Sequence, residues 1–173
     1  MKKLTLVGLC AAVLASCLLI GCGGGGWKQV SDFKPETGKY SLKLLVSAND
    51  EASGAKSKMD MSGELEISGT NPDSNVTMTI GAGKVDFDFS ADSYDDAKAM
   101  YSMVYGDGFK YDDANHKISG DMPEEMMGSF SNTSTYSDFM DLDGAKCYTA
   151  GSGKYKVVGV NAGQNIEVEF IKK

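Results

Sequence analysis

The sequence contains no arginine, and this absence narrows the classes of ligand that the protein can recognise. All 17 basic residues are lysines, against 24 aspartates and glutamates, so the 173-residue chain has a formal net charge of −7. Arginine supplies the planar, two-pronged hydrogen bonding on which recognition of phosphates, carboxylates and nucleobases commonly depends. An acidic chain without arginine therefore argues against nucleic-acid binding and against docking on anionic lipid head groups.

Histidine is nearly absent too, which limits the available kinds of catalysis. His116 is the only histidine, and it follows a turn at residues 112–115. A Ser-His-Asp site would need a nucleophile beside this histidine, and the sequence has no Gly-x-Ser-x-Gly elbow. Cys147 and His116 formally combine a nucleophile and a base, but the residues around them match no cysteine-protease signature. The sequence predicts a non-enzymatic protein in which His116 is an exposed loop residue.

Long hydrophobic runs are missing after residue 20. The run from Leu4 to Ile20 is shorter than the roughly 20 apolar residues that cross a bilayer as a helix. It follows Lys2 and Lys3 and precedes Gly21, a cysteine and four further glycines. This order of charged, apolar and small residues is typical of a secretory signal.

The sequence Leu19-Ile20-Gly21-Cys22 resembles the lipobox of bacterial lipoproteins. The resemblance implies diacylglyceryl transfer to the Cys22 thiol, cleavage before Cys22, and acylation of the new amino terminus with a fatty acid such as palmitate. Leu14-Ala15-Ser16-Cys17 also fits the pattern, but Cys22 is favoured because a glycine run, which behaves as a flexible coil, follows it. We therefore expect a lipid-anchored, extracytoplasmic protein of the bacterial cell envelope. Gly23 replaces the aspartate associated with inner-membrane retention, which favours the outer membrane where the host has two membranes.

Cleavage before the lipidated cysteine divides the chain into three parts. These are a signal peptide at residues 1–21, a lipidated cysteine with a glycine tether and a leading segment at 22–38, and one β-rich globular domain at 39–173. The mature chain is long enough for one hydrophobic core. It loses two of the 17 lysines and keeps all 24 acidic residues, so its net charge becomes about −9.

The four cysteines leave no intramolecular disulfide once the signal is removed. Cys10 and Cys17 lie in the signal peptide, and Cys22 is modified by lipid. Cys147 is then the only remaining thiol. We expect Cys147 to be a small buried hydrophobic residue rather than a reactive one.

Alternation of apolar and polar residues predicts four strands in the first half of the domain. The expected strands are residues 39–47, 58–68, 76–80 and 84–89, with turns at 49–56, 71–73 and 81–83. Alternating strands with short connections form an antiparallel meander that has one face in water.

One main amphipathic helix is predicted from Ser93 to Gly106. Two aspartates in its first turn suit the helix dipole, and Gly106 can supply the carboxy-terminal cap. We expect this helix to lie on the apolar face of the sheet through one stripe: Tyr94, Ala97, Met100, Tyr101 and Val104.

The second half of the domain gives weaker signals. Short strands are predicted at 109–111 and 117–120, a helical turn at 121–127, a loop at 128–153, and a hairpin from 154–160 and 165–171. Together these elements predict an α+β fold. It would consist of a curved antiparallel sheet, made of a meander and a C-terminal hairpin, with one main helix.

Two groups of residues are candidates for metal binding. The first is the acidic loop of Asp138, Asp141 and Asp143 before Gly144, but its spacing fails the EF-hand register, so we expect a solvated loop. The second is the set of methionines, whose thioethers suit Cu(I). Most of them occupy positions where strand or helix periodicity already requires an apolar residue. The main members of this set are Met59, Met61, Met100, Met103, Met122, Met126 and Met127.

These observations favour a lipid-anchored binding module that is not an enzyme and needs no cofactor. Its ligand would be a partner protein or an apolar small molecule, since methionine-lined cavities adapt to varied apolar ligands. The alternative is an extracytoplasmic Cu(I) carrier that uses methionine thioethers. We also expect Trp27, which follows the glycine run, to pack the end of the tether onto the domain.

Overall fold

The computed structural model describes residues 26–31, 33–50, 54–69, 75–124, 127–135 and 141–173. Within these ranges the chain forms ten strands, one α-helix and one short 3-10 helix. In chain order the elements are β1 (Lys28–Val30), β2 (Gly38–Asn49), β3 (Lys56–Ser68), β4 (Asn75–Asp88), α2 (Ala91–Tyr105), η1 (Gly106–Gly108), β5 (Phe109–Asp112), β6 (Lys117–Asp121), β7 (Gly128–Thr135), β8 (Asp143–Thr149), β9 (Lys154–Asn161) and β10 (Gln164–Lys172).

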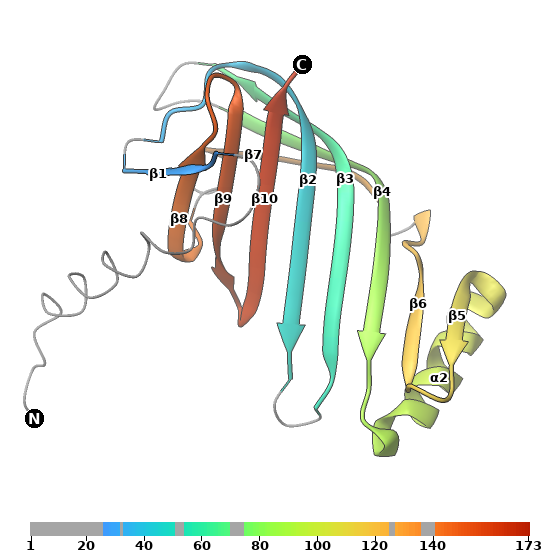
Figure 1. The fold of residues 1–173 in the computed structure, drawn as a ribbon. Coiled ribbons are helices and arrows are strands. Elements are labelled where there is room, and N and C mark those ends of the chain that lie inside the picture. Colours follow the sequence, from blue (N-terminus) through green and yellow to red (C-terminus); the bar gives the residue numbers. More distant parts are fainter. Residues whose placement is uncertain (1–25, 32, 51–53, 70–74, 125–126, 136–140) are drawn as a thin grey trace, which may run out of the picture.

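The described strands form one antiparallel sheet in the order β1-β8-β9-β10-β2-β3-β4-β6-β5. On the side of β4 that faces away from β3, residues 75–80 pair with β7 and residues 84–88 pair with β6. The strands bend at the end where β1 and β7 lie, so the sheet curves around its own inner face (Figure 1). The predicted α+β class and curved antiparallel sheet are confirmed.

One face of this sheet carries the apolar residues that the alternation predicts. A single row across the strands runs through Cys147, Val157, Val168, Leu44 and Met61. The opposite face is polar and carries cross-strand ion pairs, such as that between Lys39 and Glu66. The largest fully buried side chains are Tyr40, Leu65, Val85, Ile118, Val157 and Phe170.

The predicted turn at residues 81–83 is wrong, because these residues lie inside β4. Ser62 pairs with Ala82 and Gly63 pairs with Ile80, so Gly81 has no partner and forms a bulge. A bulge bends a strand without ending it. A pair of nearby glycines is the sequence signal of a bulge as well as of a turn. Gly63 fits this contact because it has no side chain: a Cβ there would lie 1.8 Å from the Thr79 carbonyl oxygen.

The predicted helix exists, but its start and its position differ from the prediction. Ser90 is the N-cap, and the backbone amides of Ser93 and Tyr94 donate hydrogen bonds to the Ser90 carbonyl oxygen. Gly106 ends the helix with φ 57°, as predicted. The helix covers only the corner of the sheet near β4 and β5, since two residues join it to β4 and η1 joins it directly to β5 (Figure 1).

The loop predicted at 128–153 is also wrong, because it contains β7 and β8. The predicted hairpin is confirmed as β9 and β10, and the two residues between them, Ala162 and Gly163, both have positive φ. A two-residue hairpin turn whose twist matches the strands needs this conformation. The short strands β5 and β6 are confirmed as well. The helical turn predicted at 121–127 lies partly outside the described residues.

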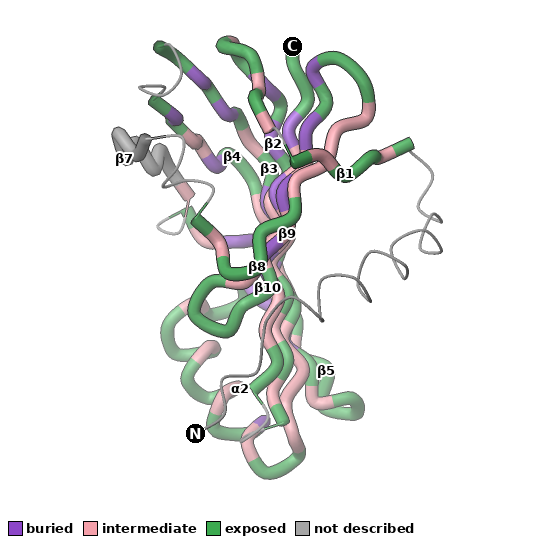
Figure 2. The backbone as a smooth tube through the Cα atoms, turned by 90° about the vertical axis from the view of Figure 1, so that its left-hand side faces the viewer, coloured by how far each residue is buried: buried purple, intermediate pink, exposed green. Residues whose placement is uncertain are grey.

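The buried residues concentrate where the sheet curves (Figure 2). Four aromatic rings there, from Phe33, Tyr40, Tyr155 and Phe170, form what we call the aromatic cluster. The Phe170 ring centroid lies 5.3 Å from both tyrosine centroids, and Phe33 packs edge-on against Tyr155 and Phe170. The Tyr40 hydroxyl donates to the Glu36 carbonyl oxygen, and burial, with Tyr155 and Glu36 nearby, raises the pKa of Tyr40 to about 12.

Candidate functional site

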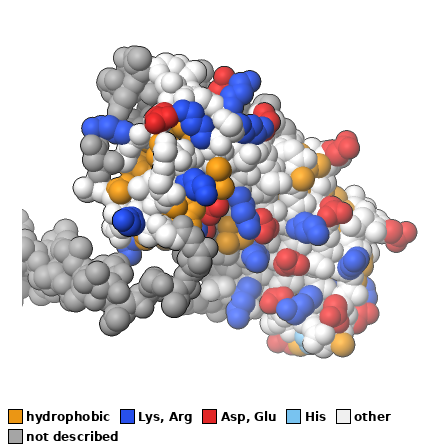
Figure 3. Space-filling view, turned by 45° about the horizontal axis from the view of Figure 1, so that its top comes forward, with side chains coloured by type: hydrophobic (Ala, Val, Ile, Leu, Met, Phe, Trp, Pro, Cys, Tyr) orange, Lys and Arg blue, Asp and Glu red, His pale blue; other side chains and the backbone are white. Residues whose placement is uncertain are grey.

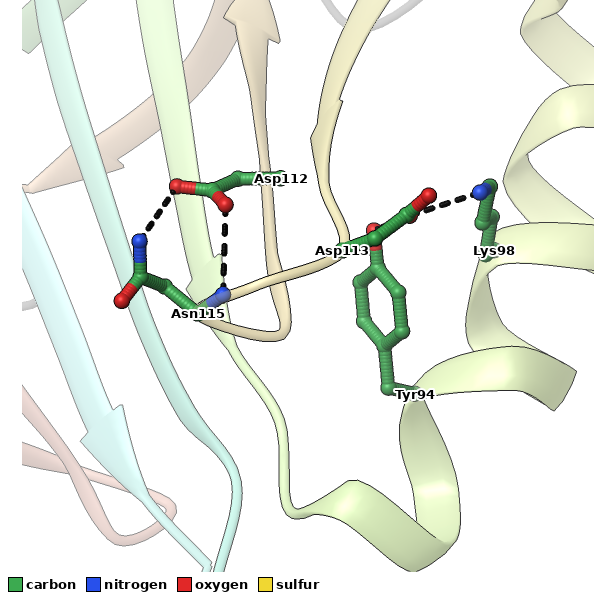
Figure 4. A network of polar contacts seen from close by, with 5 residues as sticks. All are labelled: Tyr94, Lys98, Asp112, Asp113 and Asn115. Carbon is green, nitrogen blue, oxygen red and sulfur yellow. Dashed lines mark hydrogen bonds and ion pairs between the residues drawn. The ribbon is translucent and has the colours of Figure 1, made fainter.

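The first turn of α2 is fixed to the turn between β5 and β6 by one carboxylate (Figure 4). The Tyr94 hydroxyl donates to Oδ1 of Asp113 over 2.7 Å, and Nζ of Lys98 donates to the same oxygen over 2.6 Å. The hydrogen bond from Lys98, and then that from Tyr94, lower the pKa of Asp113. Burial, together with the hydrogen bond to Asp113, raises the pKa of Tyr94 to about 12. The turn itself is closed by Asp112, which accepts hydrogen bonds from the backbone and side chain of Asn115.

The inner side of α2 is held to the sheet by aromatic rings. The Tyr101 centroid lies 5.3 Å from that of Phe87 on β4 and 5.7 Å from that of Phe109 on β5. Tyr105, one turn later, lies 5.2 Å from Phe109. Such pairs stabilise a contact beyond the area that they bury. The helix therefore presents Tyr94, Tyr101 and Tyr105 to the sheet.

This arrangement leaves an apolar surface on the outer side of the helix, which we call the α2 patch. It consists of Met100, Met103 and Val104, which are 52%, 82% and 59% exposed. The predicted stripe placed Met100 and Val104 against the sheet, and the structure corrects this. The tyrosines predict the inner side better. Tyr94 is buried, Tyr101 and Tyr105 pack partly buried against the core, and the three positions follow the helical period equally well.

The two residues considered for catalysis are far apart. His116 lies at the turn before β6, with φ 55°, and its ring centroid is 5.4 Å from that of Tyr94. Cys147 lies on β8 and is half-buried, and burial raises the pKa of its thiol. Six strand spacings separate β6 from β8 along the sheet, which is roughly 29 Å at 4.8 Å per spacing. The structure does not bring this nucleophile and base together.

The acidic loop gives no metal site in the part that the structure describes. Asp141 and Asp143 are exposed, Asp143 begins β8, and Asp138 lies outside the described residues. No group of three or more His, Cys, Asp or Glu side chains among the described residues is placed to hold a metal ion.

The methionines divide into a buried and an exposed set. Met61 and Met122 are buried on either side of Gly83: Met61 pairs with it, and Met122 Sδ lies 3.1 Å from where a Cβ on Gly83 would be. Met59, Met78 and Met127 pack half-buried against the core. The exposed methionines among the described residues belong to the α2 patch. Met126 lies outside the described residues.

Trp27 packs on the domain at the other edge of the sheet. Its ring is half-buried, and Nζ of Lys156 lies 4.9 Å from the ring centroid. Lys156 also contacts Glu167 at 2.7 Å and Glu169 at 3.3 Å. Burial alone would lower the pKa of Lys156, but the two glutamates outweigh it and the pKa is raised. The predicted signal, with Cys22 and the alternative Cys17, lies outside the described residues.

The two larger hollows on the outer face of the sheet are polar. Two shallow grooves, of about 360 and 330 Å³, share Lys84, Asp86 and Asp121 as lining residues. A third hollow, of about 90 Å³, includes Leu45 and Val158 but is too small for a typical ligand, whose pockets measure roughly 300–1,000 Å³. The two larger grooves are lined mainly by charged and polar side chains, so they lack the apolar lining that an apolar ligand would need.

Among the described residues, neither helix has the length and hydropathy required to cross a bilayer. Comparison of the chain with models of protein families, with curated proteins and with solved structures found no match.

Proposed function

We propose that this protein is a lipid-anchored extracytoplasmic module that binds a partner protein through the α2 patch. The observation that carries the proposal is the exposure of Met100, Met103 and Val104 on neighbouring turns of one helix. Single exposed apolar residues are common, but a contiguous group rimmed by charge marks an interaction surface. Methionine also suits this role because its flexible thioether side chain adapts to the surface that it contacts.

The surroundings of the α2 patch favour a protein over a small ligand. The three side chains of the patch are exposed, and none of them lines the three grooves described above. The described inner face of the sheet is occupied by its own packed rings, including those of Phe170 and Tyr155 at 5.3 Å. Exposed aspartates, among them Asp95, Asp96 and Asp107, flank the patch. A partner with an apolar groove and a basic rim would match both features.

The position of the patch suits a tethered protein. β1, which follows the predicted anchor, and β5, which follows α2, are the first and last strands of the sheet. Eight strand spacings correspond to roughly 38 Å along its surface. A lipid on Cys22 would therefore hold the α2 patch away from the point of attachment, where a second protein could reach it.

The partner contact is tested by crosslinking in cells. A photoreactive amino acid replaces Met103 in one variant and Ser62, which is exposed on the outer face of β3, in a matched control. We expect one discrete crosslinked protein from position 103 and none from position 62. Adding Val104→Glu should reduce that crosslink about tenfold, because a buried apolar side chain contributes roughly 1.5–3 kcal/mol. Equal crosslinking at both positions would refute the α2 patch as the binding surface.

The anchor is tested separately with radiolabelled palmitate. We expect the wild-type chain to incorporate the label and to remain with membranes after alkaline extraction, because more than one acyl chain is needed for stable attachment. Cys22→Ser should abolish the labelling, whereas Cys17→Ser should leave it unchanged. Labelling that survives Cys22→Ser would contradict the proposed lipidation site.

Cu(I) carriage remains the alternative proposal, and the two buried thioethers beside Gly83 are the feature that supports it. Titration of the protein with Cu(I) against a competing chelator tests it directly. Met61→Leu and Met122→Leu preserve the apolar volume, so a lower copper affinity in these variants would support a carrier. An absence of affinity in the wild type would eliminate it.

A further inference from the structure

Sulfur atoms decide where a mild oxidant reacts with this protein. Cysteine and methionine are the side chains that such oxidants attack, and accessibility to solvent decides among them. Lysine, aspartate and glutamate side chains, which are spread over much of the surface in Figure 3, carry no sulfur. The reactive positions are therefore set by the exposure of the methionines and of Cys147.

The sulfur-containing side chains of the described residues differ widely in exposure. Met100 and Met103 on α2 are 52% and 82% exposed, whereas Met61 and Met122 are buried in the core at 9% and 4%. Cys147 is half-buried, and burial raises the pKa of its thiol, which disfavours the reactive thiolate. The two methionines of α2 are thus the sulfur-containing side chains, among those described, that an oxidant in solution reaches most easily.

Oxidation at these two positions would change the surface of α2 without disturbing its packing. Met100 and Met103 are three residues apart, so they are neighbours on one side of the helix. The helix is held to the sheet from its other side, where the Tyr101 ring contacts Phe87 and Phe109. Conversion of a methionine to its sulfoxide replaces an apolar side chain by a polar one. Here the added oxygen would enter solvent, and the α2 patch would lose its apolar character.

The charges around α2 favour an uncharged oxidant. The elements that pack against the helix are η1 and β5, and with the turn after β5 these segments carry six aspartates and two lysines. One of the lysines, Lys98, is already paired with Asp113. A negative surface repels anions but leaves the approach of a neutral hydroperoxide unhindered. The charged residues counted here are Asp92, Asp95, Asp96, Lys98, Asp107, Lys110, Asp112 and Asp113.

We propose that Met100 and Met103 form a reversible oxidation site, at which hydrogen peroxide converts the α2 patch to a polar surface and releases the bound partner. This inference rests on the proposed function of the α2 patch. A lone pair of each thioether sulfur attacks one peroxide oxygen, so that an S–O bond forms and the O–O bond breaks. The sulfur is oxidised by two electrons and the peroxide is reduced. The departing hydroxide takes the proton of the transferred oxygen and becomes water.

The reaction is reversible because methionine sulfoxide reductases return the thioether. A dithiol supplies the two electrons and becomes a disulfide, and the sulfoxide oxygen leaves as water. Loss of one buried methionine contact weakens binding at least about tenfold, so two sulfoxides should weaken it about 100-fold or more.

The oxidation site is tested by peptide mass spectrometry of the full chain after treatment with hydrogen peroxide. Trypsin cleaves after Lys98 and Lys110, and the peptide 99–110 contains Met100 and Met103 as its only methionines. Peptide 59–84 contains Met61 as the buried reference, which fragmentation separates from the other methionines of that peptide. The exposed fractions of Met103 and Met61 differ about ninefold, and we expect the rates of oxidation to differ by at least that factor. Equal rates in the folded protein would overturn the site.

The effect on binding is tested with a photoreactive amino acid in place of Ala99, which is exposed beside Met100 and leaves both methionines intact. We expect peroxide to reduce the crosslink to the partner about 100-fold, and methionine sulfoxide reductase with a dithiol to restore it. The matched control is Met100→Leu/Met103→Leu, which keeps the patch apolar and has no sulfur there to oxidise. Its crosslink should survive the same treatment. The midpoint of unfolding in urea should be the same for the oxidised and the untreated wild type.

An undiminished crosslink from wild type that carries both sulfoxides would overturn the release of the partner. An equal loss of the crosslink in the double leucine variant would do so too, because the effect would then arise at another residue. A lower urea midpoint after oxidation would show damage to the fold instead of a change of surface. Absence of any crosslink from untreated protein would overturn the proposed function of the α2 patch itself, and the release with it, whereas the rates in peptide 99–110 report the oxidation site independently.

Discussion

Replacing Phe170 by alanine is the most direct test of the fold. Phe170 lies on β10 between β9 and β2, and its side chain is 0% exposed. Its ring contacts those of Tyr40, Tyr155 and Phe33 with centroid distances of 5.3, 5.3 and 6.2 Å. Three neighbours in a rigid sheet cannot collapse into the space that the ring would leave, so the substitution should create a cavity.

We expect Phe170→Ala to lower the free energy of unfolding by about 3–5 kcal/mol, from lost burial plus the cavity. A domain of this size is stabilised by roughly 5–15 kcal/mol, so this loss is a large fraction of the total. Phe170→Leu keeps most of the volume and should cost about 1.5 kcal/mol. Ile171, the next residue, faces the other side and is 38% exposed. Ile171→Ala should cost about 1 kcal/mol or less.

Equilibrium unfolding in urea, followed by the fluorescence of Trp27, measures these differences. The dependence of the free energy on urea should keep its slope, because none of the variants changes the surface exposed on unfolding by much. Equal losses for Phe170→Ala and Ile171→Ala would contradict the register of β10. A loss below about 1 kcal/mol for Phe170→Ala would show that the aromatic cluster is not the core.

Three further predictions follow from other sites. Gly63→Ala should destabilise the domain strongly, because the added Cβ would lie 1.8 Å from the Thr79 carbonyl oxygen. The Cβ of Gly81→Ala would have no atom within 4 Å and should cost much less. Equilibrium unfolding in urea compares the two variants. The pKa of Asp113 is lowered in the folded state, so its stabilising effect is present above its ordinary pKa of 3.8 and is lost as the pH falls through the lowered value. In Asp113→Asn the free energy of unfolding, measured by circular dichroism, should therefore fall less steeply as the pH is lowered. An unchanged dependence on acid pH would count against the contact of Asp113 with Tyr94 and Lys98. Met103→Glu should leave the free energy of unfolding within about 0.5 kcal/mol of the wild type while reducing partner binding, and a large loss of stability would show instead that this side chain is structural.

The strands of the core were predictable because alternation is a local property of the sequence. In β2, β9 and β10 every second residue is apolar, and the two-residue turn at Ala162 and Gly163 joins the last two strands. β7 and β8 lack this pattern and are strands because β4 and β9 supply their hydrogen-bonding partners. The bulge at Gly81 was not predicted for the same reason, since only the register of β4 with β3 distinguishes a bulge from a turn.

The surfaces were harder to predict than the strands. On α2, both the stripe through Met100 and Val104 and the stripe through Tyr101 and Tyr105 follow the helical period, and the position of Phe109 decides between them.

The forked pairing of β4 divides the molecule into parts that differ in how readily they form and open. Residues 91–121 make α2, β5 and β6 from contiguous sequence, and they join the sheet through five residue pairs with β4. The pairing of β2 with β10 instead joins residues 132 positions apart, Tyr40 and Lys172. Closing so long a loop is entropically costly and slow, whereas local contacts form quickly. The contiguous unit can therefore detach and re-form without disturbing the aromatic cluster, and its amide protons should exchange with solvent before those of β2 and β10. We therefore expect the helix with the exposed methionines to open at a lower free energy than the central strands β2 and β10.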